Sequence, residues 1–99
     1  MDFSQVSGFD WDEGNSRKSS EKHSVSQTEA EQVFTDPQLF TAPDEHHSEA
    51  EPRFHALGAT ASGRLLQVTF TLREVGTKIR IISARAMNRK ERTIYESEA

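Results

Sequence analysis

The sequence predicts an α+β fold in which helices pack on one face of a small antiparallel sheet. Two observations carry this prediction. The second half of the chain contains apolar, often β-branched residues that alternate with polar ones between short turns, which is the pattern of a β-meander. The first half and the C-terminus contain polar stretches with helix-capping signals. Ninety-nine residues suit one small domain, so we expect a loose lead-in at residues 1–8 and a single domain at residues 9–99.

The N-terminal part predicts a short strand followed by a weakly encoded helix. "FDWD" (9–12) alternates aromatic and acidic residues, as a half-buried strand does. Asp12 can cap a helix over "EGNSRKSSEKH" (13–23). No large apolar residue occurs between Trp11 and Val25, so something other than helix propensity must hold this helix.

A second helix has stronger signals. "SQTE" (26–29) is a capping box, in which the Ser26 hydroxyl accepts from the Glu29 amide and the Glu29 carboxylate accepts from the Ser26 amide. The apolar residues that follow give this helix a face to bury. Pro37 ends it, because proline cannot continue a helix.

Further strands and a final helix complete the expected order. The strands are predicted at 38–41, 53–58, 64–72 and 77–84, and the helix at about 86–97. The strand at 64–72 has the clearest pattern. Its apolar side chains face one way, while Gln67, Thr69 and Thr71 face the other.

The net charge of −4 conceals a difference between the two halves of the chain. Residues 1–52 hold three Lys and Arg against twelve Asp and Glu, a net of −9, and residues 53–99 hold nine against four, a net of +5. Such asymmetry accompanies nucleic-acid binding or an interaction face, or else the two halves pair with each other in the fold.

The composition and the N-terminal residues also predict the cellular compartment of the protein. The chain has no cysteine, which excludes a disulfide framework and a cysteine-based zinc site. Its first residues lack the basic start and apolar run of a signal peptide, and no stretch approaches the ~18 apolar residues of a membrane span. We therefore expect a cytoplasmic protein without a membrane partner.

"SARAMNRKER" (83–92) is a strongly basic stretch in this acidic chain. If a helix begins near Ala86, then Arg85, Arg89 and Arg92 fall at spacings of four and three and share one face. Such a face suits RNA phosphates or a partner protein. The alternative is an exposed helix face with local charge pairing.

Several segments, taken in order, resemble the BrnT toxins of bacterial type II toxin–antitoxin systems. They are "FDWDEGN" (9–15), "KHSVS" (22–26), "EAEQVFTDP" (29–37), "HHSE" (46–49), "RFHALGATASGRLL" (53–66) and "RIISARAMNRKERTIYE" (80–96). The resemblance covers about residues 9–96. It implies a RelE-like fold with two N-terminal helices and a C-terminal helix, and a ribonuclease toxin neutralised by a BrnA antitoxin. That antitoxin would carry a ribbon-helix-helix part, so this chain would meet operator DNA only indirectly, in a complex that represses its own promoter.

One region departs from the family pattern. Where the family reads Lys-Asn-apolar-x-Lys-His-Gly-Val, this chain has "KSSEKHSV" (18–25), with Ser19 in place of Asn. Ser20 replaces an apolar residue, which removes burial worth roughly 1.5–3 kcal/mol. Ser24 replaces glycine, which matters if the backbone there needs a positive φ. The departures suggest an alternative function, a catalytically degenerate protein that still binds its antitoxin and acts in a repressor complex.

Small RelE-like toxins cleave RNA without a metal or cofactor, as the resemblance implies. The RNA 2′-hydroxyl attacks the phosphate, so the site must remove that proton, stabilise the phosphorane and protonate the leaving 5′ oxygen. Lys22 and His23 are predicted for this chemistry, because an ammonium stabilises negative charge and an imidazole titrates near neutral pH. Otherwise they are surface groups that complement the dipole at a helix C-terminus.

Arginines supply the predicted phosphate-binding groups. Arg53 and Arg80 are predicted to be catalytic, because a guanidinium binds two phosphate oxygens at once and Arg80 interrupts an isoleucine-rich strand. RNA binding is predicted for Arg64, Arg85 and Arg89. Salt bridges to the acidic first half are the alternative for the three arginines on strands, at 53, 64 and 80.

The histidines do not predict a metal site. "DEHHSE" (44–49) offers carboxylates and two histidines, but adjacent histidines on a loop do not converge on one ion as helical His-x-x-x-His does. A structural hydrogen bond is expected for His47. His55 is expected either to line a cleft or to be exposed, and Tyr95 either to stack on a base or to pack the last helix.

Overall fold

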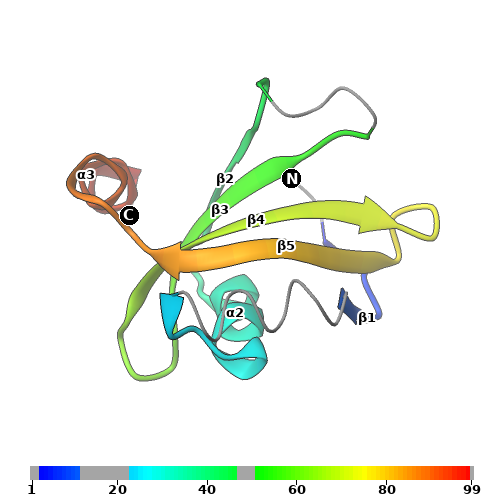
Figure 1. Ribbon diagram of the computed structural model, residues 1–99, viewed down its shortest axis with the longest axis horizontal. Helices are drawn as coiled ribbons and strands as arrows, with labels where there is room; N and C mark the ends of the chain where they lie inside the picture. Colours follow the sequence, from blue (N-terminus) through cyan, green and yellow to red (C-terminus); the bar gives the residue numbers. More distant parts are fainter. Residues whose placement is uncertain (1–2, 12–22, 47–50, 99) are drawn as a thin grey trace.

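The structure, a computed structural model, describes residues 3–11, 23–46 and 51–98. Its centre is a five-stranded sheet of order β1-β5-β4-β3-β2 (Figure 1). The strands are β1 (Gly8–Trp11), β2 (Phe40–Pro43), β3 (Phe54–Ala59), β4 (Leu65–Arg73) and β5 (Lys78–Ala86). The helices are α2 (Gln27–Gln32), the 3₁₀ helix η1 (Val33–Thr35) and α3 (Arg89–Glu98). Each strand lies within two residues of its predicted bounds.

The sheet is mixed, which corrects the expectation of a purely antiparallel sheet. β2 to β5 pair antiparallel, but β1 joins β5 in parallel, with Phe9 opposite Ile79 and Trp11 opposite Ile81. Trp11 Nε1 also donates to Glu31 Oε2 at 2.7 Å, which ties β1 to α2. The acidic start of the chain therefore lies beside its basic last strand.

One face of the sheet carries the main core, against α2 and η1. The buried residues of this core are Val25, Ala30, Val33, Ala56, Leu66, Val68, Phe70, Ile79, Ile81 and Ala84. Phe70 and Phe34 meet edge to face, with ring centroids 5.0 Å apart. A Cβ at Gly58 would lie 2.8 Å from Val33 Cγ1, so the close approach of β3 to η1 requires glycine at this position.

α3 packs on the opposite face, so the expectation that the helices share one face is wrong (Figure 1). Leu57 alternates with the core residue Ala56 along β3 and therefore points away from the main core. It forms a second cluster with Met87 and Tyr95, flanked by Phe40, Leu65 and Ile94. No helix among the described residues is long and apolar enough to cross a membrane.

α2 begins at the predicted capping box. Glu29 N donates to Ser26 Oγ, and Ser26 N donates to Glu29 Oε1, each at 3.1 Å. Of the earlier helix predicted over 13–23, only His23 is described, in helical conformation. The rest of that prediction, including Ser19 and Ser20, lies outside the described residues.

α3 begins later than predicted, at Arg89. Asn88 caps it, because Glu91 N donates to Asn88 Oδ1 at 2.8 Å and Asn88 N donates to Glu91 Oε1 at 2.9 Å. Arg85 consequently belongs to β5. The expectation that Arg85 shares a helix face with Arg89 and Arg92 is therefore wrong.

Ser24 has a φ of 55°, in the left-handed region that favours glycine. Replacing Ser24 with glycine is expected to raise the free energy of unfolding by about 0.5–1 kcal/mol, because glycine adopts this conformation without the steric cost of a Cβ. Thermal unfolding of Ser24→Gly beside Ser24→Ala checks this, since alanine keeps the Cβ and should give no gain. Equal gains in both variants would assign the effect to loss of the hydroxyl.

Candidate functional site

The second face of the sheet is lined by polar side chains in three rows. Strand register places Leu57, Gln67 and Arg85 in the first row, His55, Thr69 and Ser83 in the second, and Thr71, Arg80 and Asp10 in the third. Residues directly opposite each other on neighbouring strands point to the same side. Gln67, Thr69 and Thr71 are buried, so this "polar face" is a packed surface with a polar floor.

His55 is held at both ring nitrogens. Its Nε2 lies 3.2 Å from Oδ2 of Asp44, which is buried. Its Nδ1 contacts Gln67 Nε2 and lies 3.4 Å from Thr69 Oγ1. The Nδ1 edge of the ring therefore faces Gln67 and Thr69, and the Nε2 edge faces the Asp44 carboxylate. The protein thus uses both edges of the imidazole and fixes the plane of the ring.

Arg85 joins β5 to α3 through a two-point ion pair. Its Nη1 and Nη2 donate to the two Glu91 carboxylate oxygens at 2.7 and 2.8 Å. Burial acts to raise the pKa of Glu91, but hydrogen bonds from Arg85 and Asn88, with the charges of Arg85 and His55, outweigh it and lower that pKa. The hydrogen bond to Glu91 in turn raises the pKa of Arg85. Both groups are therefore charged near neutral pH.

A pocket of about 170 Å³ opens where α3 faces the strands β2 and β3. It is lined by Phe40, Ala42, His55, Leu57, Glu91 and Ile94. The lining is largely apolar, and His55 and Glu91 are the polar residues that contribute to it. The pocket therefore suits a flat, mostly apolar group with a hydrogen-bond donor at its edge.

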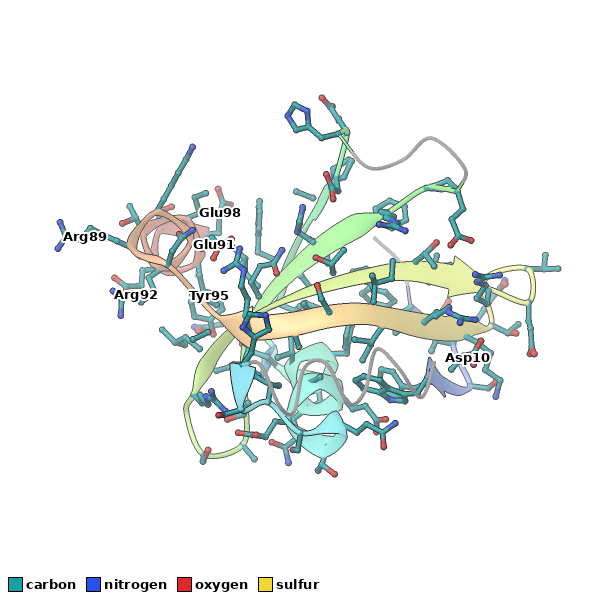
Figure 2. All side chains as sticks on the ribbon, in the orientation of Figure 1. Asp10, Arg89, Glu91, Arg92, Tyr95 and Glu98 are labelled. Atoms are coloured by element: carbon teal, nitrogen blue, oxygen red, sulfur yellow. The ribbon has the colours of Figure 1, made fainter. Side chains whose placement is uncertain are left out.

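Arg80 lies toward the other end of the polar face. Its Nη1 is 3.4 Å from Oδ2 of Asp10 on β1, and these side chains are 25% and 43% exposed. Figure 2 shows Asp10 at the end of the sheet remote from α3. This contact is longer than either contact between Arg85 and Glu91, and the carboxylate is more exposed, so a phosphate can displace Asp10 from Arg80 at less cost than Glu91 from Arg85.

Arg53 directly precedes β3, where the alternation of the strand places it on the side of His55. Its carbonyl accepts from Asp44 N at 2.8 Å, which holds the segment with Asp44 against β3. Arg53 and Arg80 therefore lie on the same side of the sheet, and their catalytic roles stay a prediction.

Arg64 is instead built into the side of the sheet that carries α2. Its Nη1 donates to Ser24 O at 2.7 Å and pairs with Glu29 Oε2 at 3.1 Å, and its Nη2 donates to His23 O at 3.3 Å. With this ion pair and those of Arg73 with Glu51 and Arg80 with Asp10, the basic half of the chain neutralises part of the acidic half.

His23 and Arg80 are not brought together. Arg64, which binds the His23 carbonyl, directly precedes β4, whereas Arg80 pairs with Thr71 seven residues further along that strand. Seven strand residues span on the order of 20 Å. Lys22, predicted beside His23 as a catalytic group, lies outside the described residues.

Replacing Arg64 with methionine is expected to lower the free energy of unfolding by about 1–2 kcal/mol, because the carbonyls of His23 and Ser24 and the Glu29 carboxylate lose their donor. The salt dependence of RNA affinity should stay unchanged. Chemical denaturation and RNA binding at several salt concentrations measure both. A salt slope reduced by about 1 with unchanged stability would instead assign Arg64 to phosphate binding, as the sequence predicted.

α3 presents a second set of cations outward. Arg89, Lys90 and Arg92 are exposed. Figure 2 shows Arg89 and Arg92 directed away from the sheet, while Glu91 and Tyr95 lie on the side of α3 that faces it. Arg89 is thus exposed on α3 without Arg85 beside it on the helix, and its contact with RNA or a partner stays a prediction.

The structure bears on metal binding by the histidines and on the role of Tyr95. Among the described residues, no group of three or more His, Asp and Glu side chains could hold a metal ion, while His47 and Glu49 lie outside the described part. Tyr95 is buried and donates to Asp36 Oδ2 at 2.6 Å, so packing of the last helix is its role in the fold.

Asp44, Gln67 and Glu91 are site residues that the sequence did not predict. Glu91 had a readable signal, because "NRKE" (88–91) has the spacing of a capping box with asparagine as the cap. Asp44 and Gln67 had none, since their contact with His55 comes from the pairing of separate strands.

Comparison with known proteins assigns the chain to a family. The family described as ribonuclease toxin, BrnT, of type II toxin-antitoxin system matches residues 11–91. The crystal structure of the Brucella abortus ribonuclease toxin, BrnT, is similar with a TM-score of 0.63 at 18% identity, over 83% of this chain and 97% of that chain. No curated protein sequence matches. The similarity of structure shows the fold, and the match over most of the sequence shows that the chain belongs to the BrnT family of toxins.

Proposed function

We propose that this protein is the toxin of a type II toxin–antitoxin pair and that it cleaves RNA without a metal ion, which inhibits translation and growth. The observation that carries the proposal is the match to the BrnT ribonuclease toxins over residues 11–91. The polar face supports it, because Arg80 and Arg85 on β5 and Arg53 at the start of β3 lie on one side of the sheet.

Cleavage requires that the 2′ oxygen bond to phosphorus while the bond to the 5′ oxygen breaks. Arg80, with Arg53, binds the phosphate and stabilises the added negative charge of the phosphorane. One group takes the 2′ proton and another donates a proton to the 5′ oxygen. Lys22 and His23 are the candidates from the sequence. Because His23 lies far from Arg80 in the structure, we expect His23→Ala to reduce cleavage less than Arg80→Ala.

Neutralisation by a BrnA-like antitoxin is the second part of the proposal. Type II toxins have a protein antitoxin, and the family match therefore implies such a partner. We propose that its DNA-binding part is a ribbon-helix-helix and that operator DNA is bound through the antitoxin. The exposed cations Arg89 and Arg92 on α3 suit contact with RNA or with an acidic or polar surface of this antitoxin.

A catalytically degenerate, antitoxin-binding protein is the second candidate function. One observation favours it: Arg64, Arg80 and Arg85, all predicted to act on RNA, each have a carboxylate partner within the protein. Such pairing lowers the charge available to a phosphate.

The test is cleavage of RNA by the purified full chain in EDTA, with heat-denatured protein as the control. Cleavage that persists in EDTA and stops when the antitoxin is added supports the proposed toxin. Cleavage that EDTA abolishes and Mg²⁺ restores overturns the metal-free mechanism. Absence of cleavage at every pH near neutral, with retained antitoxin binding, supports the degenerate protein.

A further inference from the structure

We infer that the pocket beside α3 holds a single unstacked RNA base, with the face of His55 as its stacking platform. This "base pocket" consists of Phe40, Ala42, His55, Leu57, Glu91 and Ile94. The inference rests on the proposed function and adds to it the part of the substrate that the protein selects.

The size of the pocket favours one base. Its volume of about 170 Å³ is below the ~300–1,000 Å³ of pockets that enclose whole small ligands. A planar ring system fits such a space, while the attached ribose and phosphate remain outside. Single-stranded RNA presents bases in this way, splayed out of the stack and inserted between side chains.

The walls offer the faces that a base stacks on. Phe40, Leu57 and Ile94 are apolar and lie in or beside the second cluster. The edges of His55 are already engaged by Asp44, Gln67 and Thr69, so its ring face is the part that remains for a ligand. Histidine and phenylalanine faces are recurrent stacking partners of unpaired RNA bases.

Glu91 supplies a polar contact without repelling RNA. Arg85 compensates its charge through two hydrogen bonds. Among the described residues, Glu91 Oε1 accepts from Arg85 and Asn88, whereas Oε2 accepts from Arg85, which leaves Oε2 one acceptor position. A base with an exocyclic amine can donate to it, so the pocket favours guanine, adenine and cytosine over uracil.

Cations occur on both structural elements that flank the pocket, α3 and the polar face. Arg89, Lys90 and Arg92 are exposed on the first turns of α3, next to Glu91. On the other side, the rows of His55 and Arg80 are adjacent on the polar face, two strands apart. Strand spacing puts their backbones on the order of 12 Å from each other, which an extended arginine shortens. A base at His55 therefore leaves its neighbouring phosphate near Arg80.

The experiment titrates the labelled full chain with the four nucleoside 3′-monophosphates and with inorganic phosphate, followed by amide NMR shifts. We expect the AMP, GMP and CMP titrations to shift the amides of Leu57 and Ile94, UMP to bind more weakly, and inorganic phosphate to leave both amides unmoved. Equal shifts with inorganic phosphate would overturn the inference, because the base would then contribute nothing.

Variants distinguish filling of the pocket from a change elsewhere on α3. Ile94→Trp fills the pocket, and Thr93→Trp adds the same group at the exposed neighbouring position. Loss of base stacking should weaken nucleotide binding about ten- to a hundredfold in Ile94→Trp and His55→Ala. Thr93→Trp and His55→Phe should retain it. Ala42→Met fills the pocket from β2 and serves if Ile94→Trp does not fold by circular dichroism.

RNA cleavage by the same proteins separates this inference from the ribonuclease proposal. Cleavage by the wild type, without nucleotide binding in the pocket, overturns the inference and leaves the ribonuclease intact. Nucleotide binding that Ile94→Trp abolishes, in a protein that cuts no RNA, supports the pocket and overturns the ribonuclease. Unchanged nucleotide binding in both pocket-filling variants also overturns the inference.

Discussion

Replacing Arg80 with alanine is expected to reduce RNA cleavage about 100-fold or more, because removing one donor to a developing oxyanion typically has an effect of this size. The melting temperature should change little. The Arg80 contact with Asp10 is 3.4 Å long and partly exposed, and exposed pairs contribute little to stability. The measurement is kcat/KM on a defined RNA together with a thermal unfolding curve.

Asp10→Asn is the matched control, because it removes the same ion pair from the other side and leaves the guanidinium in place. We expect this variant to cleave as well as the wild type or better, since the Asp10 carboxylate no longer competes with phosphate for Arg80. Arg80→Lys should be intermediate, because an ammonium keeps the charge but not the two-point geometry. Equal losses in Arg80→Ala and Asp10→Asn would show that Arg80 acts only through the ion pair, contrary to the proposal.

Asp36→Ala is expected to lower the free energy of unfolding by about 3 kcal/mol, because several donors to one carboxylate lose their acceptor together. Oδ2 accepts from Ala59 N at 2.8 Å and from the Tyr95 hydroxyl at 2.6 Å, and Oδ1 accepts from Gln38 N at 2.9 Å. These bonds connect η1, β3 and α3. The loss should therefore also loosen α3, which forms one wall of the base pocket. Urea unfolding measures the change.

Tyr95→Phe is the control for Asp36→Ala, since it removes one of these hydrogen bonds and keeps the buried ring. Its loss of stability should be about 1 kcal/mol. A loss as large as that of Asp36→Ala would mean that the tyrosine bond alone carries the effect, and that the backbone bonds from Ala59 and Gln38 contribute nothing.

The hydrogen-bonded pair of Tyr95 and Asp36 also predicts how the free energy of unfolding depends on pH. Burial, the hydrogen bond to Asp36 and the charge of Asp36 raise the pKa of Tyr95 to about 12. The folded state therefore keeps a proton that the unfolded state loses near its ordinary pKa, and stability falls as pH rises from about 10 to 12. Urea unfolding across this range should show the fall in the wild type but not in Tyr95→Phe.

At acid pH, Asp36 has the opposite effect, so that stability falls as pH decreases. Burial acts to raise the pKa of Asp36, but the hydrogen bonds from Tyr95, Gln38 and Ala59 outweigh it and lower that pKa. The contribution of Asp36 is therefore present above the ordinary pKa of an aspartate, and is lost as pH falls through the lowered value. Asp36→Ala should lack this part of the acid transition. The same acid slope in the variant would contradict it.

For the described residues, the sequence by itself determined which segments form the strands and the helices α2 and α3, because those signals are local. The alternation along 64–72 fixes which side chains share a face of β4, and it correctly separated Gln67, Thr69 and Thr71 from the apolar core. The capping box at Ser26 sets the start of α2 through contacts only three residues apart. The order of motifs also carried the family resemblance, which the match over residues 11–91 confirms.

Only the tertiary structure decided where those elements lie and which charges meet. β1 pairs with β5 across some seventy residues of sequence, and α3 crosses to the polar face, and neither follows from a local period. The partners of Arg64, Arg80 and Arg85 were likewise set by packing, because an arginine on a strand accepts any carboxylate that the fold brings within reach. The same assembly puts His55 against Asp44 and Gln67 and opens the pocket beside α3.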